Sequence, residues 1–449
     1  MTLKIKILTL LFLAVTTSLF SQENWSLDAC VSYAITHNLD LNNSRYTKDS
    51  SKENYRQSIR NLLPSVNGNA SYNLRFGRSV NPDTGGYTNT DFFINNYSLN
   101  SSLSLFQGFQ KLNTIAATKL IYKATKEEVL QQKYLLAFRI MSAYYDIRFF
   151  EGLLQISKEQ ETISQANYDL VQRQIELGMK AGADLYEAEA VLLTDKLAVT
   201  QSSNQLAASK LNLIQEMNLE GATTITLEIA LTEATDSNSI SEVHTDTIFN
   251  KATSFIPILK AQELRAKAAR KGVAIARGAL YPSLSFSAGY GTGYFETNTD
   301  DTGSIIPFET QLKDNASRYI GVSLSIPISN KWSGRSNVKQ RKIALLQAKN
   351  QVNVQKQELY QLIQQLVQDY KSLQIEFEQS KQRMKAQNLT FKIAQKKHEK
   401  GLISALDLYQ SKNLAANAQN ENLQVGLRLK VKSKTLDFYK GLPIFNSIP

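Results

Sequence analysis

The stretch Leu62-Leu63-Pro64-Ser65-Val66 recurs 218 residues later as Leu280-Tyr281-Pro282-Ser283-Leu284. Farther along, Ser102-Leu103-Ser104-Leu105 recurs as Ser323-Leu324-Ser325-Ile326. Gly178 through Asp184-Leu185 recurs as Gly401 through Asp407-Leu408, again in the same order. Self-similarity at a nearly constant offset indicates an internal duplication. We therefore expect two structural repeats, one over residues 23–235 and one over residues 236–449.

Each half contains two runs in which apolar residues alternate with Ser, Gly or Asn. The first half has Val66–Phe76 and Tyr97–Leu105, and the second has Leu284–Tyr294 and Ile320–Ile326. Runs of about ten residues with one apolar and one small polar face are typical of membrane-spanning strands. The pattern predicts one β-hairpin per half, at 66–106 and 283–327. Loops rich in Gly, Asn, Asp and Thr, Gly77–Asn96 and Glu296–Ser317, join the strands of each hairpin.

Four strands per chain set the oligomeric state that we expect. A soluble sandwich with one wet face would show the same alternation, but two widely separated hairpins are too few for one. Four strands cannot close a barrel, and an open sheet edge is not tolerated in lipid. A dimer would form an eight-stranded barrel filled by side chains, whereas a trimer of twelve strands begins to leave a lumen. The sequence therefore predicts a homotrimer whose twelve strands close a barrel in a lipid membrane.

Long helices are expected beside the hairpins. Lys111–Leu177 and Ser336–Lys400 contain no proline and, apart from Gly152, no glycine. Each would reach about 100 Å if helical throughout. A seven-residue series runs along the second stretch: Ile363, Tyr370, Phe377, Met384, Phe391 and His398. Sustained heptads indicate coiled-coil packing, so the predicted class is mainly α with membrane β.

The N-terminus has the features of a signal peptide. Lys4 and Lys6 precede the apolar run Ile7–Val15, and small and polar residues follow up to Gln22. We expect residues 1–22 to direct export and then to be removed. Cys30, the only cysteine, lies too far along for lipidation, and we expect it to be a small buried hydrophobe.

Composition argues against several other functions. The net charge of +11 is spread along the helices and mixed with acidic residues, so we interpret it as solvated surface and expect no nucleic-acid partner. No catalytic triad, phosphate-binding glycine loop or metal-ligand spacing occurs. The sequence therefore predicts no enzyme activity, no cofactor and no metal site.

Together these motifs resemble the TolC family of outer-membrane efflux proteins. The resemblance rests on Trp25 through Ala34 with Asn38, on the two Leu-x-Pro-Ser junctions, and on the two Gly-x5-Asp-Leu turns. It covers essentially the whole mature chain. It implies a homotrimer whose barrel continues into a helical tunnel across the periplasm. It also implies that the helical tips dock onto a periplasmic adaptor (a membrane fusion protein) linked to an inner-membrane transporter.

The resemblance places the tips at Gly178–Leu185 and Gly401–Leu408. A glycine ends each long helix, and Asp184 and Asp407 are expected to cap the returning helices. The candidate adaptor-contacting residues are Gly178, Ala183, Leu185, Gly401, Ala405 and Leu408.

The resemblance also implies a gate at the narrow periplasmic mouth. Asp407 matches an acidic ring position, and Asp184 matches its partner on the first tip. A second acidic position falls on Gln410, and positions of a closing tyrosine and arginine fall on His398 and Ile403. The closed state is therefore expected to be held differently, or less tightly, than that of well-studied relatives. Three Asp407 carboxylates around a pore would attract cations.

The function expected from this sequence is a passive duct of a tripartite export system for drugs, metals or similar small molecules. Two alternatives stay open: the outer-membrane channel of a type I protein-secretion system, and a secreted coiled-coil structural or adhesion protein.

Overall fold

The computed structural model describes residues 24–80, 85–89, 91–228 and 244–446. The chain forms two compact units, and each draws on both halves of the sequence. The sheet unit comprises residues 45–128 and 257–355, and the helical unit comprises the remaining segments. The predicted signal peptide, 1–22, and the expected divide near residue 235 lie outside the described residues.

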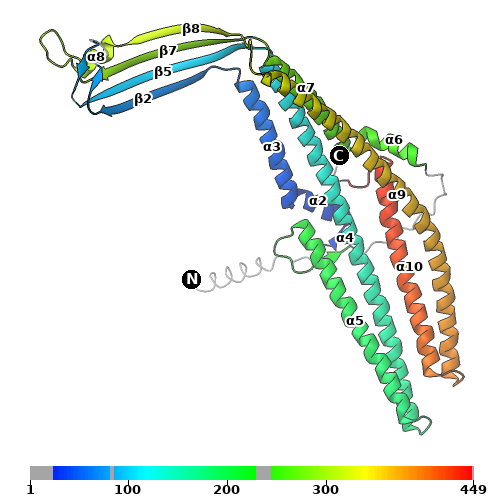
Figure 1. Cartoon of the computed structure of the whole chain (residues 1–449). Helices are drawn as coiled ribbons and strands as arrows, with labels where there is room; N and C mark the ends of the chain where they lie inside the picture. Colours follow the sequence, from blue (N-terminus) through cyan, green and yellow to red (C-terminus); the bar gives the residue numbers. More distant parts are fainter. Residues whose placement is uncertain (1–23, 81–84, 90, 229–243, 447–449) are drawn as a thin grey trace, which may run out of the picture. The chain divides into compact units, whose positions relative to one another are not determined.

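The sheet unit contains one four-stranded antiparallel sheet (Figure 1). Its strands are β2 (Ser65–Arg75), β5 (Phe92–Gln107), β7 (Ser283–Phe295) and β8 (Ser317–Ser325), in the order β2-β5-β7-β8. The four predicted strands are confirmed, and β5 and β7 join the two hairpins into a single sheet. β5 begins at Phe92, inside the expected loop Gly77–Asn96.

The strand register places most apolar side chains of the four strands on one face. Leu99 lies opposite Tyr290, Leu103 opposite Phe286, and Phe286 opposite Val322. Opposed residues of antiparallel strands share a face, so the other face is lined mainly by Asn, Ser and Gly, with Ile94, Phe295 and Tyr319 among the exceptions. A bulge between Ser104 and Phe106 places Phe106 opposite Leu284. Phe106 therefore takes the pairing position that simple alternation gives to Leu105.

Short elements occupy the connections at one end of this sheet. β3 (Ser79–Val80) pairs with β4 (Tyr87–Thr88) in the first connection, and α8 (Phe308–Asp314) lies in the second. The Gln311 side chain is buried on α8 and bonds both the N–H and the carbonyl of Phe295, each at 3.0 Å. These bonds tie α8 to the end of β7.

Two long helices confirm the expectation from the proline-poor stretches. They are α4 (Gln110–Glu176) and α9 (Ser333–Glu399), each of 67 residues. The returning helices are α5 (Gly182–Met217) and α10 (Ala405–Tyr439). Two pairs of shorter helices also match in length: α2 (Leu27–His37) with α6 (Thr245–Phe255), and α3 (Leu39–Arg60) with α7 (Pro257–Gly278).

The main core of the helical unit lies where α2 packs against α4 and α5. Its fully buried members include Val31, Ala137, Ile140, Ile147, Leu213 and Met217. A two-residue parallel pair, β1 (Asn24–Trp25) with β6 (Thr226–Leu227), adds to this core. Cys30 is fully buried here, as expected, and burial raises the pKa of its thiol to about 12.

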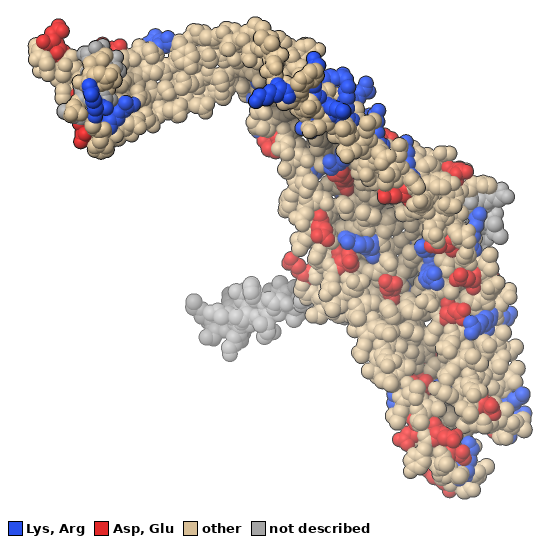
Figure 2. All heavy atoms as spheres, in the orientation of Figure 1, with Lys and Arg blue, Asp and Glu red and all other residues tan. Residues whose placement is uncertain are grey.

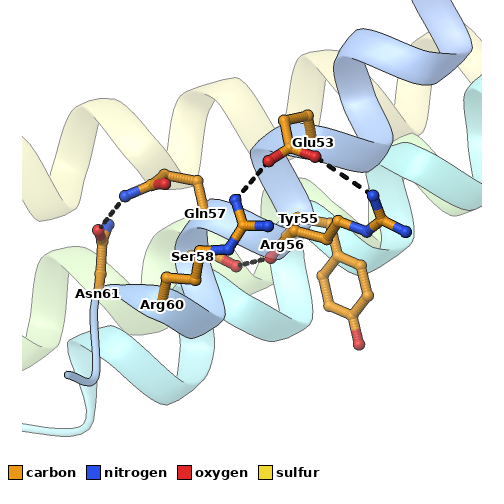
Figure 3. Close-up of polar contacts among 7 residues, drawn as sticks. All are labelled: Glu53, Tyr55, Arg56, Gln57, Ser58, Arg60 and Asn61. Carbon is orange, nitrogen blue, oxygen red and sulfur yellow. Dashed lines mark hydrogen bonds and ion pairs between the residues drawn. The ribbon is translucent and has the colours of Figure 1, made fainter.

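Charge is distributed unevenly over the sheet unit. Near the end of α3, Glu53 pairs with both Arg56 and Arg60 (Figure 3). No acidic residue occurs between Glu263 and the end of α7, or between Asp314 and Glu358. Figure 2 shows Lys and Arg side chains gathered over α7 and the adjoining start of α9. The mixing of basic with acidic residues expected along the helices therefore does not extend to these two segments.

Candidate functional site

The two helical tips reverse the chain with the same backbone motif. Gly178 and Gly401 have φ values of 73° and 71°, in the left-handed region that favours glycine. The N–H of Gly178 bonds the Ile175 carbonyl, and that of Met179 bonds the Gln174 carbonyl, both at 2.8 Å. Gly401 and Leu402 repeat both bonds with His398 and Lys397. These are Schellman ends, so the helix-terminating role expected of both glycines is confirmed.

At the second tip, Asp407 belongs to a capping box. Ser404 is the N-cap of α10, and its hydroxyl accepts the Asp407 N–H at 3.2 Å. The Asp407 carboxylate in turn accepts the Ser404 N–H at 3.1 Å and the Ser404 hydroxyl at 2.7 Å. These bonds to Ser404 hold the pKa of Asp407 below its ordinary value. Asp407 therefore caps α10 from the third helical position, as the partner of Ser404.

At the first tip, Asp184 occupies the same position without a cap. The N-cap of α5 is Ala181, which has no side-chain acceptor and makes no capping hydrogen bond. The Asp184 N–H bonds only the Ala181 carbonyl, at 3.1 Å. The expected capping role is therefore wrong for Asp184, because its capping-box partner is an alanine.

Among the other predicted gate residues, the structure links His398 with Ile403. The His398 ring nitrogen Nδ1 lies 3.3 Å from the Ile403 carbonyl oxygen, so this histidine links the end of α9 to the turn that follows it. Gln410 is exposed on α10. Within the described residues, no hydrogen bond or ion pair joins Asp184 to Asp407, His398, Ile403 or Gln410.

The predicted adaptor-contacting residues differ in exposure. Gly178, Ala183 and Gly401 are exposed, Leu185 and Ala405 are half-buried, and Leu408 is buried. Leu408 therefore packs inside the unit. Larger apolar side chains beside these positions are exposed: Leu177, Met179, Tyr186, Leu402 and Leu406.

A buried polar cluster behind the tips was missed by sequence reasoning. Lys412 of α10 is only 3% exposed and donates to Asp195 of α5 and, at 2.6 Å, to the Ser164 hydroxyl of α4. Ser164 also donates to Asp195. Burial lowers the pKa of the Lys412 ammonium, and the bonded carboxylate partly opposes that shift. The cluster joins three helices about 12 Å along α10 from Ser404, at 1.5 Å per residue.

The sequence does carry a signal for this cluster. On α5, positions seven apart hold Ala188, Asp195, Ser202 and Ser209, and all four are buried. Ser202 lies 3.0 Å from the Ser157 hydroxyl of α4. A heptad series of small and polar residues therefore forms part of the α4–α5 contact, beside the apolar series.

In the part of the chain that the structure describes, no group of three or more His, Cys, Asp or Glu side chains could hold a metal ion. No described helix combines the length and the apolar character needed to cross a membrane.

The sequence matches a known protein family in both halves. A family model described as "Outer membrane efflux protein" matches residues 30–218 and 250–442. TolC of Vibrio cholerae is 23% identical over 305 residues, which span 67% of this chain and 64% of TolC. TtgC of Pseudomonas putida, a probable efflux pump outer membrane protein, is 19% identical over 430 residues, spanning 93% of this chain and 82% of TtgC.

Solved structures share the fold over nearly the whole chain. CusC superposes with a TM-score of 0.76 at 18% identity, covering 95% of this chain and 96% of CusC. VceC of Vibrio cholerae superposes with a TM-score of 0.73 at 15% identity, covering 93% of this chain and 96% of VceC.

Proposed function

This chain belongs to the outer membrane efflux protein family, and from that premise we propose that three copies form a passive export duct through the outer membrane. The duct would close twelve strands into a barrel and extend its lumen between the long helices. It would carry small molecules past the outer membrane without chemical change. Residues 1–22 would direct its export, and the strands, rather than a lipid on the buried Cys30, would hold it in the membrane.

The observation that carries this proposal is the state of the sheet in a single chain. Its apolar face is open, with Tyr72 67%, Leu99 53% and Val322 64% exposed. Its edge strands, β2 and β8, each pair on one side only. An apolar face and two unpaired edges are compatible with lipid only when further strands complete the sheet. Copies of the same sheet supply those strands.

We propose the tips as the adaptor-docking end and the gate. Exposed Leu177, Met179 and Leu402 offer apolar contacts to a periplasmic adaptor. Rings of Asp184 and Asp407 would make the narrow mouth attractive to cations. The cluster of Lys412, Asp195 and Ser164 would hold α10 against α4 and α5 in the closed state.

The cargo follows from the pump that such a duct serves. Relatives differ here: TtgC is described as part of an efflux pump, and CusC of Escherichia coli as part of a cation efflux system. We propose efflux of small molecules, with a type I protein-secretion channel as the second candidate. Purifying the protein with its native adaptor and transporter would separate these two.

The test of the duct is its behaviour in membranes. The full-length chain, expressed with its own leader, should fractionate with outer membranes and require detergent for extraction. Cross-linking should give a trimer, and planar-bilayer recordings should show conductance that rises when the tips open. Recovery as a soluble species without detergent, or trimers that give no conductance, would overturn the proposal.

A further inference from the structure

Two stripes of basic residues lie where the helices meet the sheet. On α7, Lys267, Arg270 and Arg277 fall on one face at helical spacing, and on α9, Arg335, Lys339 and Lys342 do the same. We call these six residues the basic collar. All six side chains are exposed. None of them forms an ion pair with another described residue.

The two stripes belong to adjoining segments of the sheet unit. A Cβ added to Gly334, at the start of α9, would approach the Leu280 side chain to 2.7 Å. Leu280 lies between the end of α7 at Gly278 and the start of β7 at Ser283. The first turns of α9 therefore pack on the junction between α7 and the sheet, and Figure 2 shows Lys and Arg side chains gathered in this region.

Neighbouring bases that serve structural roles are already neutralised. Arg265 of α7 pairs with Glu128 through two hydrogen bonds of 2.7 and 2.9 Å. Arg56 and Arg60 of α3 share Glu53 (Figure 3). The collar instead lies in the acid-free segments of α7 and α9, and within the described residues no ion pair neutralises it.

The depth of the collar coincides with the expected membrane interface. Its residues lie within about 17 Å of the helix ends that adjoin the sheet, at 1.5 Å per residue. The lipid headgroup layer extends about 5–7 Å beyond the hydrocarbon on each side, and Lys and Arg side chains extend toward it by snorkelling. Arg277, Arg335 and Lys339, which lie within about 9 Å of those helix ends, are thus within reach of headgroups if the sheet spans the hydrocarbon, and Lys267 lies farthest from them.

Exposed aromatic residues mark the same level independently. Trp332, Tyr281 and Phe109 are 68%, 58% and 62% exposed, and all three lie in strand–helix junctions. Trp and Tyr concentrate at membrane interfaces. Lys331 and Trp332 both adopt left-handed φ values, 56° and 65°, which are uncommon for such side chains and typical of functional sites. The Arg335 guanidinium stacks 4.3 Å from the Trp332 ring.

We propose that the basic collar binds the phosphate groups of anionic phospholipids in the leaflet next to the helices. The occupant follows from charge complementarity, since the collar residues nearest the sheet would lie at a layer whose headgroups carry phosphate. Trp332 and its aromatic neighbours would fix the depth, and the collar would fix the lipid class. The inference rests on the proposed membrane duct, because only an inserted sheet brings the collar to headgroup level.

The test uses the full-length protein in vesicles made of equal parts phosphatidylcholine and phosphatidylglycerol. Spin-labelled lipids report which headgroup is enriched beside the protein. The test variant carries Arg335→Gln, Lys339→Gln and Lys342→Gln. The matched control carries Lys381→Gln, Lys385→Gln and Lys392→Gln, which remove the same charge farther along α9.

Beside the wild-type protein, phosphatidylglycerol should be enriched over phosphatidylcholine. In the test variant this enrichment should be about tenfold lower. A single base contributes about fivefold, and screening between neighbouring bases reduces the combined effect of three. The control should match wild type. Raising the salt to 1 M, where the Debye length is about 3 Å, should abolish the wild-type preference, and this measurement needs no variant to fold.

Each failure has a distinct meaning. A conducting wild-type trimer without lipid preference would overturn the collar and leave the duct intact. A variant with altered ion selectivity but unchanged lipid preference would place the bases in the lumen and also overturn it. Absence of conductance in every protein would instead count against the proposed duct.

Discussion

The two tips share a motif and a backbone but use their aspartates differently. Both long helices end in the same glycine motif, and both aspartates stand at the third position of the returning helix. The difference comes from the N-cap residue three positions before each aspartate, since the Ser404 side chain can cap a helix and that of Ala181 cannot. The Asp407 carboxylate is bonded within its own tip, whereas that of Asp184 has no capping partner. The shared Gly-x5-Asp-Leu motif therefore does not determine whether its aspartate caps the helix.

The largest expected effect comes from breaking the buried cluster that joins the two tips. Lys412→Met leaves the Asp195 carboxylate buried without its cation, and should lower the free energy of unfolding by about 3–5 kcal/mol. Denaturant titration of the purified protein measures the loss. Adding Asp195→Leu should recover most of it, because the unpaired charge is then gone. Equal stability of wild type and the Lys412→Met variant would show that the cluster does not hold the tips together.

Changing either N-cap residue should reduce the difference in stability between the starts of α10 and α5. Ser404→Ala should weaken the start of α10 by about 1 kcal/mol, and Ala181→Ser should strengthen the start of α5 by a similar amount or less. Amide hydrogen exchange at residues 405–408 and 182–185 reports each tip separately. If Ser404→Ala left protection of α10 unchanged, the capping box would not be what orders the second tip.

Removing one carboxylate at a time should separate charge from capping. Asp184→Asn and Asp407→Asn should each lower the cation selectivity of the duct, since both remove ring charge. Only Asp407→Asn should also speed hydrogen exchange at the start of its helix. Bilayer recordings and exchange on the same proteins make the comparison. Selectivity unaffected by either change would place both residues away from the constriction.

The smallest expected effect is a loss of stability at the start of α10 when the pH falls into the acid range. The pKa of Asp407 lies below its ordinary value of 3.8 because the carboxylate accepts bonds from Ser404. Capping is therefore fully present above that ordinary pKa and is lost as the pH falls through the lower folded value. Exchange protection at residues 405–408 should fall in that acid range, and the Ser404→Ala variant should show a smaller step, because only the backbone N–H of residue 404 then bonds the carboxylate.

Much of the fold follows from periodicity that the sequence displays directly. The long proline-free stretches predicted α4 and α9 nearly to the residue, and alternation predicted the four strands and their apolar face. The bulge after Ser104 was missed because it depends on the partner strand. The pairing of β1 with β6 was missed because each strand has two residues and the partners lie far apart in sequence.

The candidate site was less accessible to sequence reasoning. Its glycines are recognisable because only a left-handed turn requires them at that point. The difference in capping between Asp407 and Asp184 depends on the N-cap residue, which the Gly-x5-Asp-Leu motif does not specify. Lys412 was missed because an exposed and a buried lysine look alike in sequence, and only the facing Asp195 and Ser164 distinguish them.

The pairing of β5 with β7 also bears on how the duct assembles. That contact joins two hairpins inside one chain, in the same manner in which β8 of one copy would meet β2 of the next in the proposed trimer. If each hairpin were a separate chain, a ring would need six chains, and by mass action the amount of ring would depend on the sixth power of their concentration. Because the two halves are one chain, three chains suffice and the dependence falls to the third power. A full ring can therefore form from far fewer molecules per cell.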